Sequence, residues 1–257
     1  MQPTAARGLP AYSLPIEPSA FLEHVRADGD RIALVADGHL NAEVPPCPGW
    51  TVQNVVTHLA EVYEHKIACT LLEKMPDPWP PKWDPERDPV EWLVDAHQRL
   101  LTLFWERGPK APSGTWWPPD QTVGFWDRRM AHETVIHRVD VEISLDQLTA
   151  VDPALAVDGV DEVLTIFLAG DWSEDPDERC HGQRIVVSTG GRSWEVELLP
   201  EAVTVSPPHG GPDAVVSGEP EAVLLWLWGR RSDAGLSRQG DASVPALLRD
   251  RLMLATQ

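Results

Sequence analysis

Five segments in the first two thirds of the chain repeat their hydrophobic residues with the period of an α-helix. They span residues 19–36, 51–74, 90–107, 126–144 and 152–168. The second segment has a broad apolar stripe and a candidate N-cap, Thr51, directly before it. Loops rich in proline or containing glycine separate most of the segments. This pattern predicts a bundle of four or five antiparallel helices.

The hydrophobic period changes from nearly four to two beyond an acidic run, GDWSEDPDERCHG, at residues 170–182. Short alternating segments at 184–189, 194–198, 201–206 and 214–217 predict strands, and residues 219–228 and 244–254 predict helices. We therefore expect an α plus α/β protein with two domains. A helical bundle would span residues 1–172 and a small α/β domain residues 183–257, joined by the acidic run as a linker.

The composition narrows the range of partners. The chain has 40 acidic and 21 basic residues, for a formal net charge of −19, which argues against nucleic acid and against an anionic membrane surface. It has no signal-peptide pattern and no apolar run long enough to span a bilayer. Three cysteines form no CxxC pair. We expect a soluble, cytoplasmic protein that is a monomer or a small homo-oligomer.

The segment 126–144 contains two candidate metal ligands. Glu133 and His137 are four residues apart, so on a helix both side chains point the same way. In an antiparallel bundle, His58 of the second helix can reach the same place. Two imidazoles and a carboxylate suit Zn²⁺ with one position open, and they also suit non-haem Fe(II). A closed structural site would need a fourth protein ligand, for which His65 and Cys69 are candidates.

Other sites have less support in the sequence. His132 adjoins Glu133 but lies about 100° away around the helix, so we do not expect it to bind the same metal. Cys47 is a candidate nucleophile, although its Pro-rich loop offers nothing to lower the thiol pKa. The chain has no phosphate-binding loop after a strand and no GxSxG motif. A metal-dependent hydrolase and a metal- or ligand-binding protein without catalysis both stay open.

Two motifs of the predicted bundle resemble the mycothiol-dependent maleylpyruvate isomerase family. They are PCPGWTVQNVVTHLAEV at residues 46–62 and HETVIHRVD at residues 132–140. A third segment, VSGEPEAVLLWLWGRR at residues 216–231, resembles the end domain of that family. The resemblance implies a DinB-like helical bundle followed by a sterol-carrier-like α/β domain.

The resemblance also implies a function. The metal ligands of the family fall on His58, Glu133 and His137, and the metal holds the thiolate of mycothiol, a low-molecular-weight thiol. An arginine of the end domain assists catalysis, which points to Arg230, with Arg231 as the alternative. We therefore expect an isomerase or S-transferase that acts on a small electrophile. The Pro- and Trp-rich segments at 79–89 and 115–120 do not match the isomerase, and they indicate a bulkier, more apolar substrate.

Overall fold

The computed structural model describes residues 16–77, 79 and 86–256, and the chain forms two compact units. The first unit spans Ile16–Thr149, and the second contains the chain from Ala150 onward. The first unit is helical, and the second combines helices with one sheet. The predicted fold class, α plus α/β, is confirmed.

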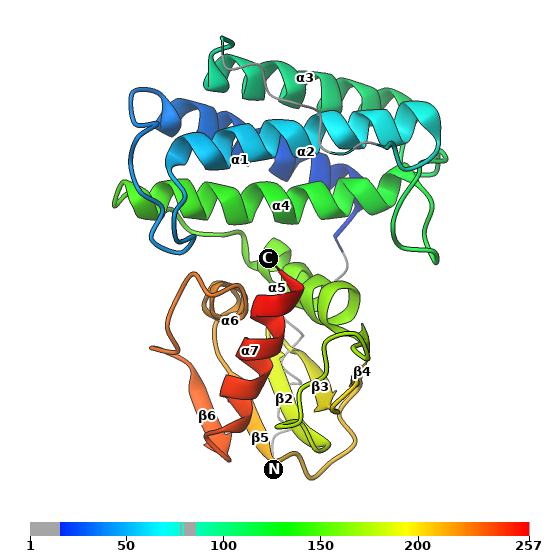
Figure 1. Cartoon of the computed structure of the whole chain (residues 1–257), viewed down its shortest axis with the longest axis vertical. Coiled ribbons are helices and arrows are strands. Elements are labelled where there is room, and N and C mark those ends of the chain that lie inside the picture. Colours follow the sequence, from blue (N-terminus) through cyan, green and yellow to red (C-terminus); the bar gives the residue numbers. More distant parts are fainter. Residues whose placement is uncertain (1–15, 78, 80–85, 257) are drawn as a thin grey trace, which may run out of the picture. The chain divides into compact units, whose positions relative to one another are not determined.

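Four helices that run side by side form the first unit (Figure 1). They are α1 (Pro18–Ala36), α2 (Val52–Leu72), α3 (Pro89–Arg107) and α4 (Val123–Ser144). The N-cap of α2 is Thr51, as predicted. The backbone N–H and the hydroxyl of Thr51 both donate hydrogen bonds to Asn54 Oδ1. A glycine that follows α3, Gly108, has a φ of 74°, a conformation that costs other residues energy. Of the Pro- and Trp-rich segment at 79–89, residues 80–85 lie outside the described residues, and Pro89 is the first residue of α3.

A glycine inside α1 allows close packing of a buried histidine. The Nε2–H group of His97 in α3 donates a hydrogen bond to the Val25 carbonyl oxygen, 3.0 Å away, and the ring stacks on Tyr63 of α2. A Cβ atom at Gly29 would lie 2.5 Å from His97 Nε2. Glycine is less favourable than other residues inside a helix, but here any side chain would collide with the ring of His97.

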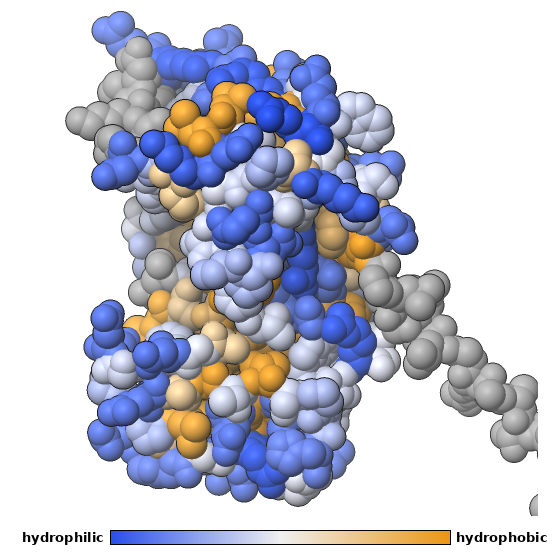
Figure 2. Space-filling model, turned by 90° about the vertical axis from the view of Figure 1, so that its right-hand side faces the viewer, coloured by the Kyte–Doolittle hydropathy of each residue, from blue (hydrophilic) through white to orange (hydrophobic). Residues whose placement is uncertain are grey.

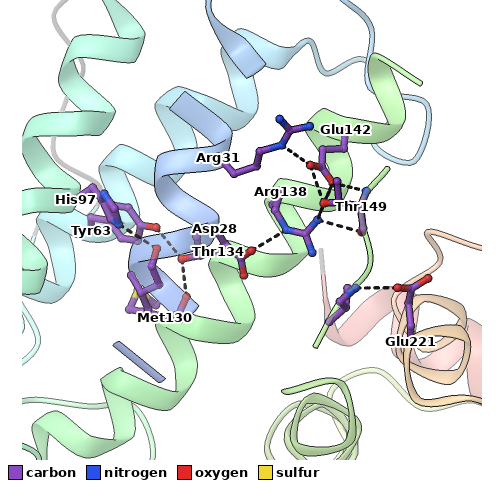
Figure 3. A network of polar contacts seen from close by, with 12 residues as sticks. Asp28, Arg31, Tyr63, His97, Met130, Thr134, Arg138, Glu142, Thr149 and Glu221 are labelled. Carbon is purple, nitrogen blue, oxygen red and sulfur yellow. Dashed lines mark hydrogen bonds and ion pairs between the residues drawn. The ribbon is translucent and has the colours of Figure 1, made fainter. Parts of the chain in front are cut away.

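A second polar network joins α1 to the end of α4 (Figure 3). Arg138 pairs with Asp28 of α1 and with Glu142, and Arg31 donates to Glu142 at 2.8 Å. Arg138 and Glu142 are both buried, and the Thr149 side chain and backbone N–H complete the bonding of the Glu142 carboxylate. This network fixes the C-terminal half of α4, which contains the predicted metal ligand His137.

The second unit is a six-stranded sheet with helices. Its strands are β1 (Gly170–Asp171), β2 (Gln183–Thr189), β3 (Arg192–Leu198), β4 (Ala202–Ser206), β5 (Ala214–Ser217) and β6 (Ser237–Gly240), in the order β1-β4-β3-β2-β5-β6. The pair β2–β5 is parallel, and the other pairs are antiparallel. The remaining elements are helices α5 (Pro153–Glu162), α6 (Pro220–Leu227) and α7 (Val244–Ala255), and the π-helix η2 (Val163–Leu168).

The boundary between the units differs from the predicted one. Helix α5 packs on α6, and η2 packs on α7, so residues from Ala150 belong to the second unit. The acidic run is also part of that unit, since β1 pairs with β4 and the buried Arg251 guanidinium donates to the carbonyl oxygens of Asp175 and Pro200. The predicted boundary at 170–182 therefore lies too late in the chain.

On the face that Figure 2 shows, hydrophilic residues predominate and hydrophobic residues form separate patches. This agrees with the large excess of acidic residues. Among the described residues, no helix is both long and apolar enough to cross a bilayer.

Candidate metal centre

The structure brings the three predicted metal ligands together between α2 and α4. The Nε2 atom of His58 lies 3.2 Å from Glu133 Oε1, and the Nε2 atom of His137 lies 3.3 Å from the same oxygen. One potential ligand atom from each residue lies within 4.8 Å of the others. The side chains of His58 and Glu133 are 29% and 18% exposed, so a small molecule could reach the cluster from one side.

Two neighbours on α4 hold these side chains in place. The buried Arg129 guanidinium donates to Glu133 Oε2 at 2.5 Å, and Asp140 Oδ2 lies 3.1 Å from His137 Nδ1. Burial alone would raise the pKa of Glu133, but Arg129 and the two histidines hold it well below its usual range. Burial would lower the pKa of His137, but Asp140 and Glu133 raise it to about 9. The carboxylate of Glu133 is therefore ionised, and the Nε2 atom of His137 is directed at it.

The arrangement fits a divalent metal by the chemistry of its donors. Two imidazole nitrogens and one carboxylate oxygen converge, which is the ligand set of many catalytic zinc sites. The contact of His137 Nδ1 with Asp140 is the carboxylate–histidine arrangement that fixes the tautomer and orientation of a metal ligand. Among the described residues, no fourth His, Cys, Asp or Glu belongs to this group.

The other candidate metal ligands, His65 and Cys69, do not join these three side chains. His65 contacts Lys66 and Cys69, and neither His65 nor Cys69 belongs to the triad. The ring of His132 packs edge-on against Phe21 of α1. Cys47 lies near the centre, but its sulfur is 3.8 Å from Asp140 Oδ2, and a carboxylate does not favour a thiolate.

Sequence reasoning did not single out Trp50. Its ring stacks on His137 at an interplanar angle of 14° and meets His58 edge-on at 5.3 Å between ring centroids. Trp50 directly precedes the N-cap of α2, so the start of that helix places the indole against both histidines. The side chain therefore contacts two of the three candidate ligands.

Two family models match the chain. The mycothiol maleylpyruvate isomerase N-terminal domain matches residues 22–142, and the MDMPI C-terminal domain matches residues 154–247. Together they cover more than half of the sequence. The chain belongs to the mycothiol maleylpyruvate isomerase family. This is a family of enzymes, and its two domain models fall within the two compact units of the structure.

Solved structures share the fold of this member of the mycothiol maleylpyruvate isomerase family. The crystal structure of the mycothiol-dependent maleylpyruvate isomerase has a TM-score of 0.57 and 15% identity, and the match covers 90% of this chain and 96% of that chain. A histidine-to-alanine mutant of that isomerase gives a TM-score of 0.55 with 16% identity and the same coverage. No curated protein matches the chain.

The arginine that the family resemblance selects lies after α6 in the second unit. Arg230 is partly exposed, and its Nη1 atom donates to the Trp228 carbonyl oxygen at 2.8 Å. A second arginine, Arg249 of α7, donates to the Leu227 carbonyl oxygen. Burial lowers the pKa of Arg249, and the charge of Arg230 lowers it further, so the two guanidinium groups lie close together. Sequence reasoning missed Arg249, because only the packing of α7 brings it to this helix end.

A cluster of three tryptophans surrounds a buried lysine in the first unit. The Nζ atom of Lys66 lies 4.7 Å from the ring centroid of Trp126 and 5.7 Å from those of Trp79 and Trp116. It also lies 2.9 Å from His65 Nδ1. Lys66 is 6% exposed, and burial lowers its pKa to about 8. Trp79 and Trp116 come one from each of the two Pro- and Trp-rich segments.

Proposed function

We propose that this protein is a mycothiol-dependent isomerase or S-transferase whose divalent metal is bound by His58, Glu133 and His137. The observation that carries the proposal is the convergence of these three side chains within 4.8 Å, in a chain that belongs to the mycothiol maleylpyruvate isomerase family. We expect the metal to be Zn²⁺ and the reaction to take place in the cytoplasm.

The residues of the centre are arranged to present a metal with one open side. Asp140 orients the imidazole of His137, and Arg129 orients the carboxylate of Glu133, so the ligands are held before a metal arrives. A bound divalent metal would favour the thiolate form of a thiol, which otherwise titrates near pH 8.5. Trp50 would limit the angle at which the thiol and its electrophile approach.

The reaction class follows from a thiolate next to an electrophilic double bond. Sulfur forms a bond to the β-carbon, and the electron pair of the double bond moves to the carbonyl oxygen as an enolate. Rotation followed by elimination of the thiolate gives the isomer, and protonation of the α-carbon gives the S-conjugate. We propose that the guanidinium group of Arg230 stabilises the enolate.

The lysine–tryptophan cluster supports a substrate with a carboxylate and an apolar body. Lys66 lies eight residues after His58 on α2, about 12 Å along the helix axis. Its ammonium group has three donors, its nitrogen lies 2.9 Å from His65 Nδ1, and the carboxylate of Glu133 acts on it only through its charge. Trp79 and Trp116 are each about two-fifths exposed and would pack on the apolar part of the substrate. We therefore favour thiol transfer to such a substrate over isomerisation of maleylpyruvate.

Two other functions would use the same centre. A hydrolase would activate water in place of sulfur, and a binding protein would hold a metal or ligand without catalysis. A hydrolase predicts a filled metal site without recognition of the thiol, so affinity for mycothiol separates it from the proposal. A binding protein that holds the thiol would not consume it, so the thiol-consumption assay separates that alternative.

The test is calorimetry of mycothiol binding to metal-loaded and metal-stripped protein. We expect micromolar binding with release of a proton in the loaded protein, and a large loss of affinity in the stripped protein. Absence of binding at millimolar thiol, with the metal site filled, would contradict the proposal and favour one of the two alternatives. Thiol-consumption assays with a panel of carboxylated and neutral electrophiles then identify the substrate class.

A further inference from the structure

The first unit contains a cavity of about 340 Å³ that no part of the proposed chemistry uses. It lies where the start of α1, the end of α3 and the start of α4 meet, and Leu22, Phe104 and Trp105 form its apolar walls. An adjoining cavity of about 370 Å³ shares Leu22 and Trp105, so the two form one groove along α1 and α3. The volume is in the range of small-molecule sites.

One acidic side chain, Asp127, lines this cavity. The residue is 1% exposed, and its Oδ1 atom has no hydrogen-bond partner in the part of the chain that the structure describes. An unpaired carboxylate in an apolar site is destabilising because it loses its hydration without gaining a partner. A ligand that donates a hydrogen bond to Asp127 Oδ1 would remove this penalty, which accounts for an unpaired oxygen at this position.

The cavity is separate from the metal centre. Asp127 precedes Glu133 by six positions on α4, which places the two side chains about 120° apart around the helix. Trp126, which lies nearly in line with Glu133, packs on Trp116 instead. The two sites therefore use different faces of one helix.

We propose that this cavity binds a small organic cation, whose ammonium group pairs with Asp127 while its apolar body packs on Leu22, Phe104 and Trp105. The buried carboxylate selects the charge, and the apolar walls select the body. The indole of Trp105 adds a face on which a cation is attracted. A divalent metal is a poor fit, because Ca²⁺ and Mg²⁺ require several oxygen ligands and Asp127 is the one acidic residue that lines this cavity among those described.

The experiment compares two probes of the same shape, 2-phenylethylammonium and neutral 2-phenylethanol, by calorimetry on the full chain. We expect the cation to bind about tenfold more tightly or better, and Asp127→Asn to remove this preference while the alcohol binds as before. Glu106→Gln is the matched control, since it removes an exposed carboxylate from the adjoining cavity. It should leave both affinities unchanged.

A variant that fills the cavity gives a second test of the proposal. Leu22→Trp fills the cavity and should abolish binding of both probes, with helix content unchanged by circular dichroism. Equal affinities for the two probes, an unchanged preference in Asp127→Asn, or an equal loss in Glu106→Gln would each overturn the proposal. The last result would show attraction of cations by the overall charge of −19.

Discussion

The Nε2 atom of His58 lies 3.2 Å from Oε1 of Glu133, although 75 positions separate the two residues in the chain. The contact joins α2 to α4 at the point where His137 also reaches the same oxygen. A half-buried ionised carboxylate and two imidazoles at one point contribute little to packing, because partial burial costs each of them hydration. The cluster is better explained as a preformed ligand set.

Substitution of a ligand should remove the metal without unfolding the bundle. We expect His58→Ala and His137→Ala each to lose most of the metal measured by elemental analysis, because two remaining ligands bind a divalent ion weakly. His65→Ala is the matched control, as His65 lies on the same helix but outside the triad. Full metal occupancy in His137→Ala, or loss in His65→Ala alone, would show that the ligand assignment is wrong.

The contact between Asp140 and His137 should tune the metal affinity. Asp140→Asn keeps the size of the side chain but weakens the hydrogen bond that orients the imidazole. We expect metal affinity to fall about 10- to 100-fold, measured by competition with a chelator, while circular dichroism stays unchanged. An unchanged affinity would mean that Asp140 has no role in orienting the ligand.

Helical periodicity predicts only part of the ligand triad. Glu133 and His137 share a helix face by their spacing, an antiparallel bundle allows His58 to reach them, and the family resemblance selects the same three residues. The same spacing rule relates Arg129 to Glu133, so this contact was predictable in principle. The contacts of Trp50 and Lys66 were not, because they depend on how loops fold over the bundle.

The missed elements of the second unit also have physical reasons. Strand β6 consists of exposed polar residues at the edge of the sheet, so it shows no alternation of apolar and polar positions. The segment η2 is almost wholly apolar, and a π-helix cannot be told from an α-helix by such a pattern. The domain boundary is misplaced because helical period identifies α5 as a helix but does not say which unit it packs against.

The catalytic role proposed for Arg230 can be separated from a role in folding. We expect Arg230→Ala to lower turnover of the thiol reaction with metal content and melting temperature intact, because the substitution removes a charge that acts on the enolate. Arg231→Ala is the control, since this neighbour is exposed and lies 3.6 Å from Glu221. Loss of turnover in Arg231→Ala alone would transfer the role to that residue.

Lys66 should affect the choice of substrate more than the metal or the thiol. We expect Lys66→Met to raise KM for a carboxylated electrophile about tenfold or more, because it removes the buried cation that would pair with the carboxylate. The KM for the methyl ester of the same compound, and the affinity for mycothiol, should stay nearly constant. An equal effect on acid and ester would show that Lys66 has a structural role only.

Asp127 should make the stability of the bundle depend on pH in a specific direction. Burial raises the pKa of its carboxyl group to about 7 in the folded state, whereas an unfolded aspartate titrates near 3.9. Between these values the folded state binds the extra proton, so the contribution of Asp127 to the free energy of unfolding falls as pH rises. Below this window the carboxyl group is protonated in both states and costs nothing, and above it the full penalty of a few kcal/mol applies.

Asp127→Asn removes this titration, so the variant should gain stability over the wild type as pH rises from about 5 to 8. The measurement is urea unfolding of both proteins at several pH values, where the other titrating groups cancel in the difference. Glu106→Gln serves as the control, because an exposed carboxyl group has little influence on folding. A stability difference that stays constant with pH would show that Asp127 is not ionised at a cost in the folded protein. The difference should shrink when 2-phenylethylammonium is present, because the ligand then supplies the charge that the buried carboxylate lacks.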